Sequence, residues 1–506
     1  MSRQAGERTD RAMRIALLVA LATMAVAAFG VMARSTYGAQ TSSDEPQYLL
    51  TALSLADDFD LDISDEIERR AFEPFHEIGL NTQTFALNES GQRISPHDPL
   101  LPLVSAPAMW VGGWVGVRVL LVLIGGLVAG LTAWTAIRRF GVSSVGGLIG
   151  VGSVMVGAPI AAYSTQVFPE ILAALCVAGI VAAATAPRLG TRHLAAIAVA
   201  VIALPWLSVK YGLVAAVAVA VVGWRLAQSR RWTDVGTLAA VLALAGVVYF
   251  IVHQRIYGGW TVYSTGDHFI DDGEFAVVGT DPNYLGRSRR LVGLLADRRF
   301  GLMPWAPIWL LAPAAVAAFL ARPRHTAGGS PGENFDGADH RWLVALPLIA
   351  GWFTATFVAL TMHGWWSPGR QIVVIVPLVG LPLASWIDGR RALMWVAGAA
   401  GVIGASNWIW LGVEAMTDRR VLIVDFHETA ALGYRLVSPL FAQGWPVIDN
   451  ADLVLAVWGI IVATSMIVAF LHERQHWDGS APSDTDQATD EAAPDFTTSA
   501  LSDAAT

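Results

Sequence analysis

Residues 235–253 read VGTLAAVLALAGVVYFIVH, a run that contains no Asp, Glu, Lys or Arg. A helix rises about 1.5 Å per residue, so a run of this length can cross the roughly 30 Å hydrocarbon core of a bilayer. Similar runs recur along the 506-residue chain, which is 54% hydrophobic and 15% charged, whereas a soluble domain carries roughly a quarter charged residues. The sequence therefore predicts an all-α polytopic membrane protein.

Together these apolar runs predict about twelve transmembrane helices. The first follows a basic N-terminus, as a signal peptide does, but it is long for one and lacks a good cleavage context, so we expect it to be retained. The spans are expected near 14–33, 117–137, 142–159, 167–186, 193–206, 209–224, 235–253, 302–321, 342–361, 369–387, 392–411 and 453–471.

Arginines predict the orientation, because short cytoplasmic loops are enriched in Arg and Lys. Arg138 and Arg139, the region 188–192, the region 225–231, and Arg390 with Arg391 alternate with short connections that lack both residue types. This alternation places both termini in the cytoplasm. The loops 34–116, 254–301 and 412–452 are then non-cytoplasmic.

The expected organisation has four parts. Residues 1–13 are a cytoplasmic N-terminus, 14–411 a transmembrane core that includes loops 34–116 and 254–301, 412–471 an outer loop with the last span, and 472–506 a disordered cytoplasmic tail. Within the first long loop, helical spacing of apolar residues predicts surface helices over 45–57 and 63–72. The segment 323–340 has the composition of a linker.

Several site types are excluded by the residues present. The net charge of −8 is concentrated in loops and the tail, so it gives no indication of a nucleic-acid partner. The single cysteine, Cys176, lies in an apolar run and cannot form an internal disulfide. We find no phosphate loop, dinucleotide fingerprint, zinc spacing or nucleophile elbow. No metal ligands or cofactor are assigned, although a divalent cation stays open.

Two adjacent acids, Asp44 and Glu45, follow the first span and precede the helix predicted over 45–57. A carboxylate at this place can act as a general base toward an acceptor hydroxyl. The alternative is a helix start, because acids in a first turn complement the helix dipole and Pro46 suits an early helical position.

Two more charged residues lie at the outer ends of predicted spans. Glu170, after Val167-Phe168-Pro169, opens the fourth span, where an acid is either interfacial or directed into the bundle. Lys210 is the only lysine among 33 basic residues and lies beside a break in an apolar stretch. Its point charge suits a phosphate, whereas the alternative is an interfacial anchor.

A late outer turn reads HGWWSPGRQ over 363–371. Arg370 can bind two phosphate oxygens at once, and its position on the outer face opposes the charge rule. His363 and Trp365 lie close by in the chain. An earlier proline-rich segment over 95–102 contains His97 and Asp98, which can contact a sugar hydroxyl, although two adjacent ligands do not make a metal site.

Together these segments resemble the GT-C glycosyltransferases that use polyprenyl-phosphate sugars, in particular the protein O-mannosyltransferase and aminoarabinose-transferase branch of actinobacterial type. The resemblance covers roughly residues 10–410. The matching parts are Asp44-Glu45, the proline-rich segment 97–102, Pro169-Glu170, the stretch 299–307 and Trp366–Arg370. Relatives often carry a basic residue where this chain has His97-Asp98, and some carry a large soluble C-terminal domain that this chain lacks.

The resemblance implies an enzyme: an inverting glycosyltransferase acting at the non-cytoplasmic face of a bacterial cell membrane. Asp44 would be the base and Glu45 its catalytic neighbour. Lys210 and Arg370 would bind the lipid phosphate. The residues implied to position the acceptor or sugar are Glu170, His97, Asp98, His363 and Trp365.

The implied partners are a polyprenyl-phosphate sugar donor, membrane lipid, and a cell-envelope glycan, lipid or protein as acceptor, with no nucleic acid. The sugar is a hexose or pentose of the mannosyl or arabinosyl kind. Two alternatives stay open. One is a transporter or flippase of lipid-linked intermediates, although no internal repeat is visible. The other is a scaffold that keeps the fold without catalysis.

Overall fold

The computed structural model describes residues 2–81, 83, 91–262, 283–322, 340–359, 362–443 and 451–478. This part of the chain is almost entirely helical and contains isolated β-bridges but no named strand. Eight of its helices are long and apolar enough to cross a membrane. The protein is therefore a multi-pass membrane protein, as the sequence predicted.

The helices and helical turns follow one another along the chain. The α-helices are α1 (Ser2–Ala27), α2 (Glu45–Asp57), α3 (Ser64–Glu68), α4 (Leu100–Arg139), α5 (Ser144–Met155), α6 (Ile160–Tyr163), α7 (Glu170–Ala184), α8 (Thr191–Leu207), α9 (Gly212–Gln228), α10 (Trp232–Tyr257), α11 (Tyr284–Arg287), α12 (Arg290–Ala296), α13 (Leu302–Trp305), α14 (Ala312–Ala321), α15 (Arg341–Phe353), α16 (Val376–Ile387), α17 (Arg391–Met416), α18 (Leu432–Val437) and α19 (Ala451–Asp478). The shorter turns are η1 (Ala28–Gly30), η2 (Val209–Tyr211), η5 (Pro307–Leu310), η6 (Thr354–Val358), η7 (Arg370–Ile375), η8 (Phe426–Glu428) and η9 (Ser438–Leu440).

Each of the predicted spans overlaps an apolar helix. Four of these helices, α5, α7, α8 and α14, have only 10–17 residues, fewer than the roughly 20 that a crossing needs. The number twelve therefore stays a prediction. The span expected over 302–321 is divided into α13, η5 and α14, because its prolines cannot donate the backbone hydrogen bonds of a continuous helix.

Two expectations about the outer loops need adjustment. The helix predicted over 45–57 is confirmed as α2, but the one predicted over 63–72 is only α3, which ends before Arg70 adopts a left-handed backbone with φ of 57°. Helix α4 begins well before the span expected at 117, and its two halves join at Gly112 and Gly113, which have non-helical backbone angles.

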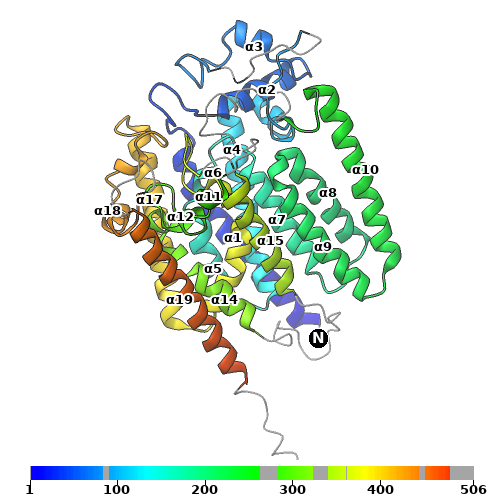
Figure 1. The fold of residues 1–506 in the computed structure, drawn as a ribbon, viewed down its shortest axis with the longest axis vertical. Coiled ribbons are helices and arrows are strands. Elements are labelled where there is room, and N and C mark those ends of the chain that lie inside the picture. The colour runs from blue at the N-terminus through cyan, green and yellow to red at the C-terminus, as the bar shows by residue number, and fades with distance from the viewer. Residues whose placement is uncertain are drawn as a thin grey trace, which may run out of the picture.

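Different helices lie at the two ends of the molecule's long axis (Figure 1). Helices α2 and α3 lie at one end, while the N-terminus and the far end of α19 lie at the other. Helices α8, α9 and α10 form one flank, α1 packs on α4, and α19 packs on α14. Residues 472–478, expected in the tail, continue α19, and the rest of that tail lies outside the described residues.

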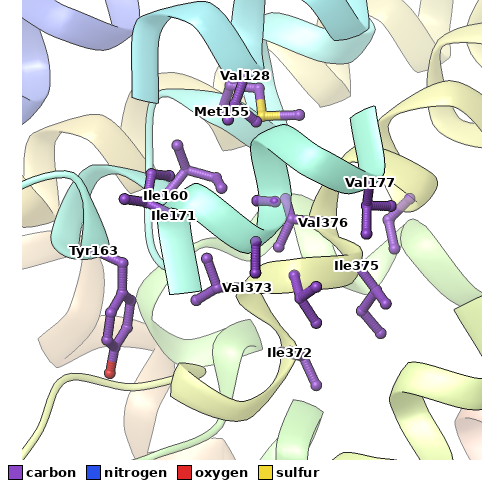
Figure 2. Close-up of a cluster of buried hydrophobic side chains, with 14 of the residues drawn as sticks. Val128, Met155, Ile160, Tyr163, Ile171, Val177, Ile372, Val373, Ile375 and Val376 are labelled. Carbon is purple, nitrogen blue, oxygen red and sulfur yellow. The ribbon is translucent and has the colours of Figure 1, made fainter. Parts of the chain in front are cut away.

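Close packing of small residues holds the bundle together, as expected where lipid supplies no hydrophobic drive between helices. A Cβ added to Gly150 of α5 would lie 2.4 Å from the Cα of Ala384 in α16. Around this contact, Figure 2 shows buried side chains of α4, α5, α6, α7 and η7 meeting in one cluster. This core supports the start of η7, which carries Arg370.

Buried charges tie helices together at both ends of the bundle. Arg118 of α4 is 1% exposed and donates to the carbonyls of Val31 and Ala33, just after α1 and η1. At the opposite end, Glu473 of α19 pairs with Arg322 at 2.9 Å and Arg390 at 2.7 Å. These contacts satisfy polar groups that would be costly to leave unpaired inside the protein.

Candidate functional site

The acid pair after the first span has two separate structural roles. Asp44 is the N-cap residue of α2, but its side chain accepts no capping hydrogen bond. Glu45, the first residue of α2, accepts through Oε1 from the backbone N–H of Ser42 at 3.0 Å, which fixes the segment before the helix. Ser43 between them has a left-handed backbone with φ of 50°, which is uncommon for a residue with a side chain. Asp44 is thus left to make contacts elsewhere.

Glu45 is fully buried and connects two segments of the candidate site. Its Oε2 accepts from the backbone N–H of Val167 at 2.8 Å, which joins the start of α2 to the residues before α7. Burial raises the pKa of Glu45, against the opposing charge of Arg118 and the hydrogen bonds from Val167 and Ser42. Both carboxylate oxygens accept from backbone N–H groups, so Glu45 joins these two segments of the chain.

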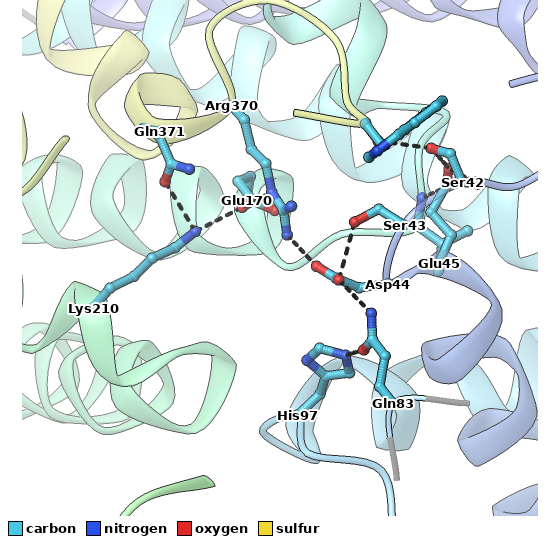
Figure 3. Close-up of polar contacts among 12 residues, drawn as sticks. Ser42, Ser43, Asp44, Glu45, Gln83, His97, Glu170, Lys210, Arg370 and Gln371 are labelled. Atoms are coloured by element: carbon cyan, nitrogen blue, oxygen red, sulfur yellow. Dashed lines mark hydrogen bonds and ion pairs between the residues drawn. The ribbon is translucent and has the colours of Figure 1, made fainter. Parts of the chain in front are cut away.

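Asp44, Arg370, Glu170 and Lys210 form one continuous chain of ion pairs (Figure 3). Arg370 Nη2 lies 2.9 Å from Asp44 Oδ2, and Arg370 Nε lies 3.0 Å from Glu170 Oε1. Lys210 Nζ contacts the same Glu170 oxygen at 2.8 Å. The four residues come from α2, η7, α7 and η2, so the fold gathers two acids and two cations, as expected from the sequence.

All four side chains lie at helix beginnings. Asp44 immediately precedes α2, Glu170 and Arg370 are the first residues of α7 and η7, and Lys210 lies in the turn before α9. Helix N-termini carry partial positive charge and unpaired N–H groups, which favour anions. The arrangement therefore combines two side-chain cations with a local field of the same sign.

Two aromatic rings lie against the guanidinium of Arg370. Its Cζ lies 3.9 Å from the ring centroid of Phe168 and 4.7 Å from that of Trp366, and only 8% of its side chain is exposed. The preceding Gly369 has φ of 80°, and a Cβ there would lie 2.6 Å from Leu302 Cδ2. A side chain at 369 would be strained and would collide with α13, so glycine is required before Arg370.

The second oxygen of Asp44 is held from the opposite side. Gln83 Nε2 donates to Asp44 Oδ1 at 3.1 Å, and Gln83 Oε1 lies 2.7 Å from His97 Nε2. The His97 ring in turn stacks on Tyr48 with ring centroids 4.7 Å apart. His97 therefore reaches the acid indirectly, through Gln83.

The ionisation of Asp44 follows from these neighbours. Burial alone would raise the pKa of its carboxyl, but the charges of Arg370 and His97 and the hydrogen bonds from Arg370 and Gln83 outweigh burial. The pKa of Asp44 is consequently held well below its usual range. The carboxylate is ionised at physiological pH and is a weak base while Arg370 contacts it.

Three other predicted residues lie outside this chain of contacts. Asp98 is buried and accepts from His253 Nε2 at 2.9 Å and Tyr249 at 3.4 Å, so it faces α10. His363 lies 3.6 Å from Asp297 Oδ2. The Trp365 side chain is 60% exposed, although its carbonyl accepts from Ser42 Oγ at 3.0 Å.

Sequence reasoning missed several residues that the fold brings to the site. Phe168 and Trp366 lie in the segments that contain Glu170 and Arg370, but nothing in a linear sequence shows that their rings contact Arg370. Gln83 and His253 had no signal at all, because a lone amide in a loop and a lone histidine at a span end are ordinary. Only the folded structure shows that Gln83 contacts Asp44 and that His253 contacts Asp98.

A separate acidic group, formed by the residue after α2 and two residues of α3, is the one place among the described residues where carboxylates could surround a metal ion. It consists of Asp58, Asp65 and Glu66. Arg69 already lies 3.1 Å from Glu66 and 4.0 Å from Asp65, so a guanidinium neutralises much of this group. We assign no metal to it.

Comparisons with known proteins give a likeness in fold only. No protein-family model and no curated protein matches this chain. Two crystal structures of ArnT from Cupriavidus metallidurans are similar. The one bound to undecaprenyl phosphate has a TM-score of 0.49 and 13% identity over 92% of this chain and 78% of that chain. The apo state gives 0.48 and 14%, over 89% and 76%. At these values, function has to be inferred from the site itself.

Proposed function

We propose that this protein is a membrane glycosyltransferase of the GT-C type, which transfers a sugar from a polyprenyl phosphate to an acceptor hydroxyl. The observation that carries the proposal is the chain of contacts from Asp44 through Arg370 and Glu170 to Lys210. It brings Asp44 and Glu170 together with two cations at helix beginnings, next to the start of α2. The resemblance in sequence segments supports the same chemistry.

The cations suit the phosphate of the donor. Arg370 presents a planar guanidinium in contact with two rings, and Lys210 contributes a point charge through the shared partner Glu170. When the sugar leaves, the phosphate oxygen gains negative charge, and preorganised cations in a water-poor site stabilise that charge strongly. Activation resides in the lipid phosphate, so no nucleotide-binding fold is needed.

Asp44 is the proposed general base. The acceptor oxygen forms a new bond to the anomeric carbon, the bond from that carbon to the phosphate oxygen breaks, and its electron pair leaves with the phosphate. The hydroxyl proton passes to Asp44. Attack on the face opposite the phosphate inverts the anomeric centre.

The other acids position these groups. Glu170 is 1% exposed and holds both cations through one oxygen, while Glu45 ties the start of α2 to the segment before α7. His97 acts through Gln83, and Asp98, His363 and Trp365 stay candidates for the acceptor side. The proposed orientation puts this end of the molecule outside the cytoplasm, as the arginine-rich loops predict.

The test is transfer by purified protein in detergent. Polyprenyl-phosphate hexoses and pentoses of defined structure are offered with isolated membranes from cells that lack the protein as the acceptor source. A glycosyltransferase releases polyprenyl phosphate and labels an acceptor. A transporter or flippase produces neither, because its activity needs two compartments. Absence of transfer from every donor, together with flipping of the intact donor in liposomes, would refute the proposal.

A further inference from the structure

The contacts of Asp44 have a consequence for the order of events at the proposed site. Each oxygen of Asp44 has its own partner: Oδ2 lies against Arg370 Nη2 at 2.9 Å, and Oδ1 accepts from Gln83 at 3.1 Å. Oδ1 also accepts from Ser43 Oγ at 3.1 Å. The base is therefore covered by a cation on one side and anchored by neutral donors on the other.

Arg370 uses one edge of its guanidinium for both acids. Nε faces Glu170 and Nη2 faces Asp44, and these two groups form the fork with which arginine binds carboxylate or phosphate in a bidentate manner. A phosphate that takes this fork must displace a carboxylate. The rings of Phe168 and Trp366 lie against the guanidinium, and only 8% of the side chain is exposed. Arg370 therefore has little room to move, and the competition takes place where its guanidinium now lies.

The two carboxylates differ in how easily they can be displaced. Glu170 has a side chain only 1% exposed and keeps Lys210 as a second cationic partner. Asp44 is 19% exposed and pairs directly with Arg370 through Oδ2, while the neutral donors Gln83 and Ser43 hold its other oxygen in place. Loss of the Arg370 contact therefore frees Oδ2 without releasing the side chain.

We propose that the phosphate of the lipid donor competes with Asp44 for Arg370, so that the base becomes available only once the donor is bound. Gln83 is then a positioning residue that holds Asp44 through Oδ1, and His97 orients Gln83. This inference rests on the proposed function. It implies that the donor binds before the proton is transferred. When no donor is bound, Asp44 stays paired with Arg370 and is not available to the acceptor.

The low pKa of Asp44 agrees with this order. Arg370 is a main cause of that low value, after the opposing effect of burial. A general base works best with a pKa near the operating pH. Removal of the Arg370 contact by the donor moves the carboxyl pKa toward that range at the moment when a base is needed.

A double-mutant cycle tests the competition. The affinity for undecaprenyl phosphate is measured with the full-length protein in nanodiscs, for wild type, Asp44→Asn, Arg370→Met and the double variant. Asp44→Asn should tighten binding by about tenfold, the size of one charged hydrogen bond that no longer has to be broken. The same substitution should change affinity less than about twofold in the Arg370→Met background, where nothing is left to compete for.

The results have distinct meanings. Unchanged or weaker binding by Asp44→Asn overturns the competition, and so does an equal gain in both backgrounds, which indicates a general field effect. If Arg370→Met fails to fold, Arg370→Lys replaces it, since an ammonium lacks the shared fork. No binding of undecaprenyl phosphate by folded wild-type protein would overturn the proposed function itself, and this inference with it.

Gln83→Leu provides an independent measurement of positioning. It should leave undecaprenyl phosphate affinity within about twofold of wild type and lower kcat, because Gln83 contacts the base and not Arg370. Gln83→Asn, which keeps the amide on a shorter side chain, should recover part of kcat. Equal kcat values for Gln83→Leu and wild type would remove the positioning role.

Discussion

Replacement of Asp44 by asparagine is the most direct perturbation of the proposed chemistry. The substitution keeps the shape of the side chain and an oxygen that can accept from Gln83, but it removes the charge opposite Arg370 and the capacity to take a proton. If Asp44 is the base, the transition state loses proton transfer while the rest of the site keeps its geometry.

The expected magnitude follows from the role. A positioned general base contributes about 10²–10⁴-fold to a rate, which corresponds to about 3–5 kcal/mol of activation free energy. The loss should appear in kcat, because the donor's phosphate is bound by Lys210 and Arg370 rather than by Asp44. Donor binding should not weaken.

The assay measures release of polyprenyl phosphate and labelling of the acceptor under single-turnover conditions. Asp425→Asn is a matched control, because Asp425 is a buried aspartate that lies 3.5 Å from Arg420 and accepts from Val421 N–H in a separate outer loop. This variant should transfer sugar at the wild-type rate. Transfer by Asp44→Asn within about threefold of wild type would show that Asp44 is not the base.

Three further perturbations test the site and its support. Lys210→Met or Arg370→Met should each weaken undecaprenyl phosphate binding by about 10–100-fold, the value of a charged hydrogen bond. Arg322→Met, at the opposite end of the bundle, is the control. Unchanged affinity in the Lys210 or Arg370 variant argues against its role in binding phosphate. Glu473→Gln weakens two ion pairs of α19 and should lower the free energy of unfolding by about 1–3 kcal/mol. A thermal melt in detergent measures this change. An unaltered melting temperature would show that these ion pairs do not stabilise the fold. Burial, followed by the hydrogen bond with Asp65, raises the pKa of Glu66 to about 7. Between its usual pKa and 7 the folded state holds more protons than the unfolded state, so stability falls as pH rises. Glu66→Gln should remove that slope, and an identical slope in both proteins would show that Glu66 does not cause it.

Hydrophobic runs predicted the membrane class because crossing a bilayer is a local property of about twenty consecutive residues. Every expected span overlaps an apolar helix, and α2 has the bounds that its amphipathic spacing indicated. Helix ends were less well predicted. Proline and glycine positions in α4 and around α13 divide or bend helices according to what packs on them.

For the candidate site, the sequence determined which residues could act, since Lys210 is the single lysine and Arg370 follows a short connection that the loop charges predict to be non-cytoplasmic. Only the tertiary structure decided how they are paired. Asp44 and Arg370 are 326 positions apart, and no spacing rule reaches that far. The structure also separated Glu45, which binds backbone, from Asp44, which contacts Arg370. Helix formation depends on neighbours in the chain, whereas an ion pair depends on which helix beginnings the packed core brings together.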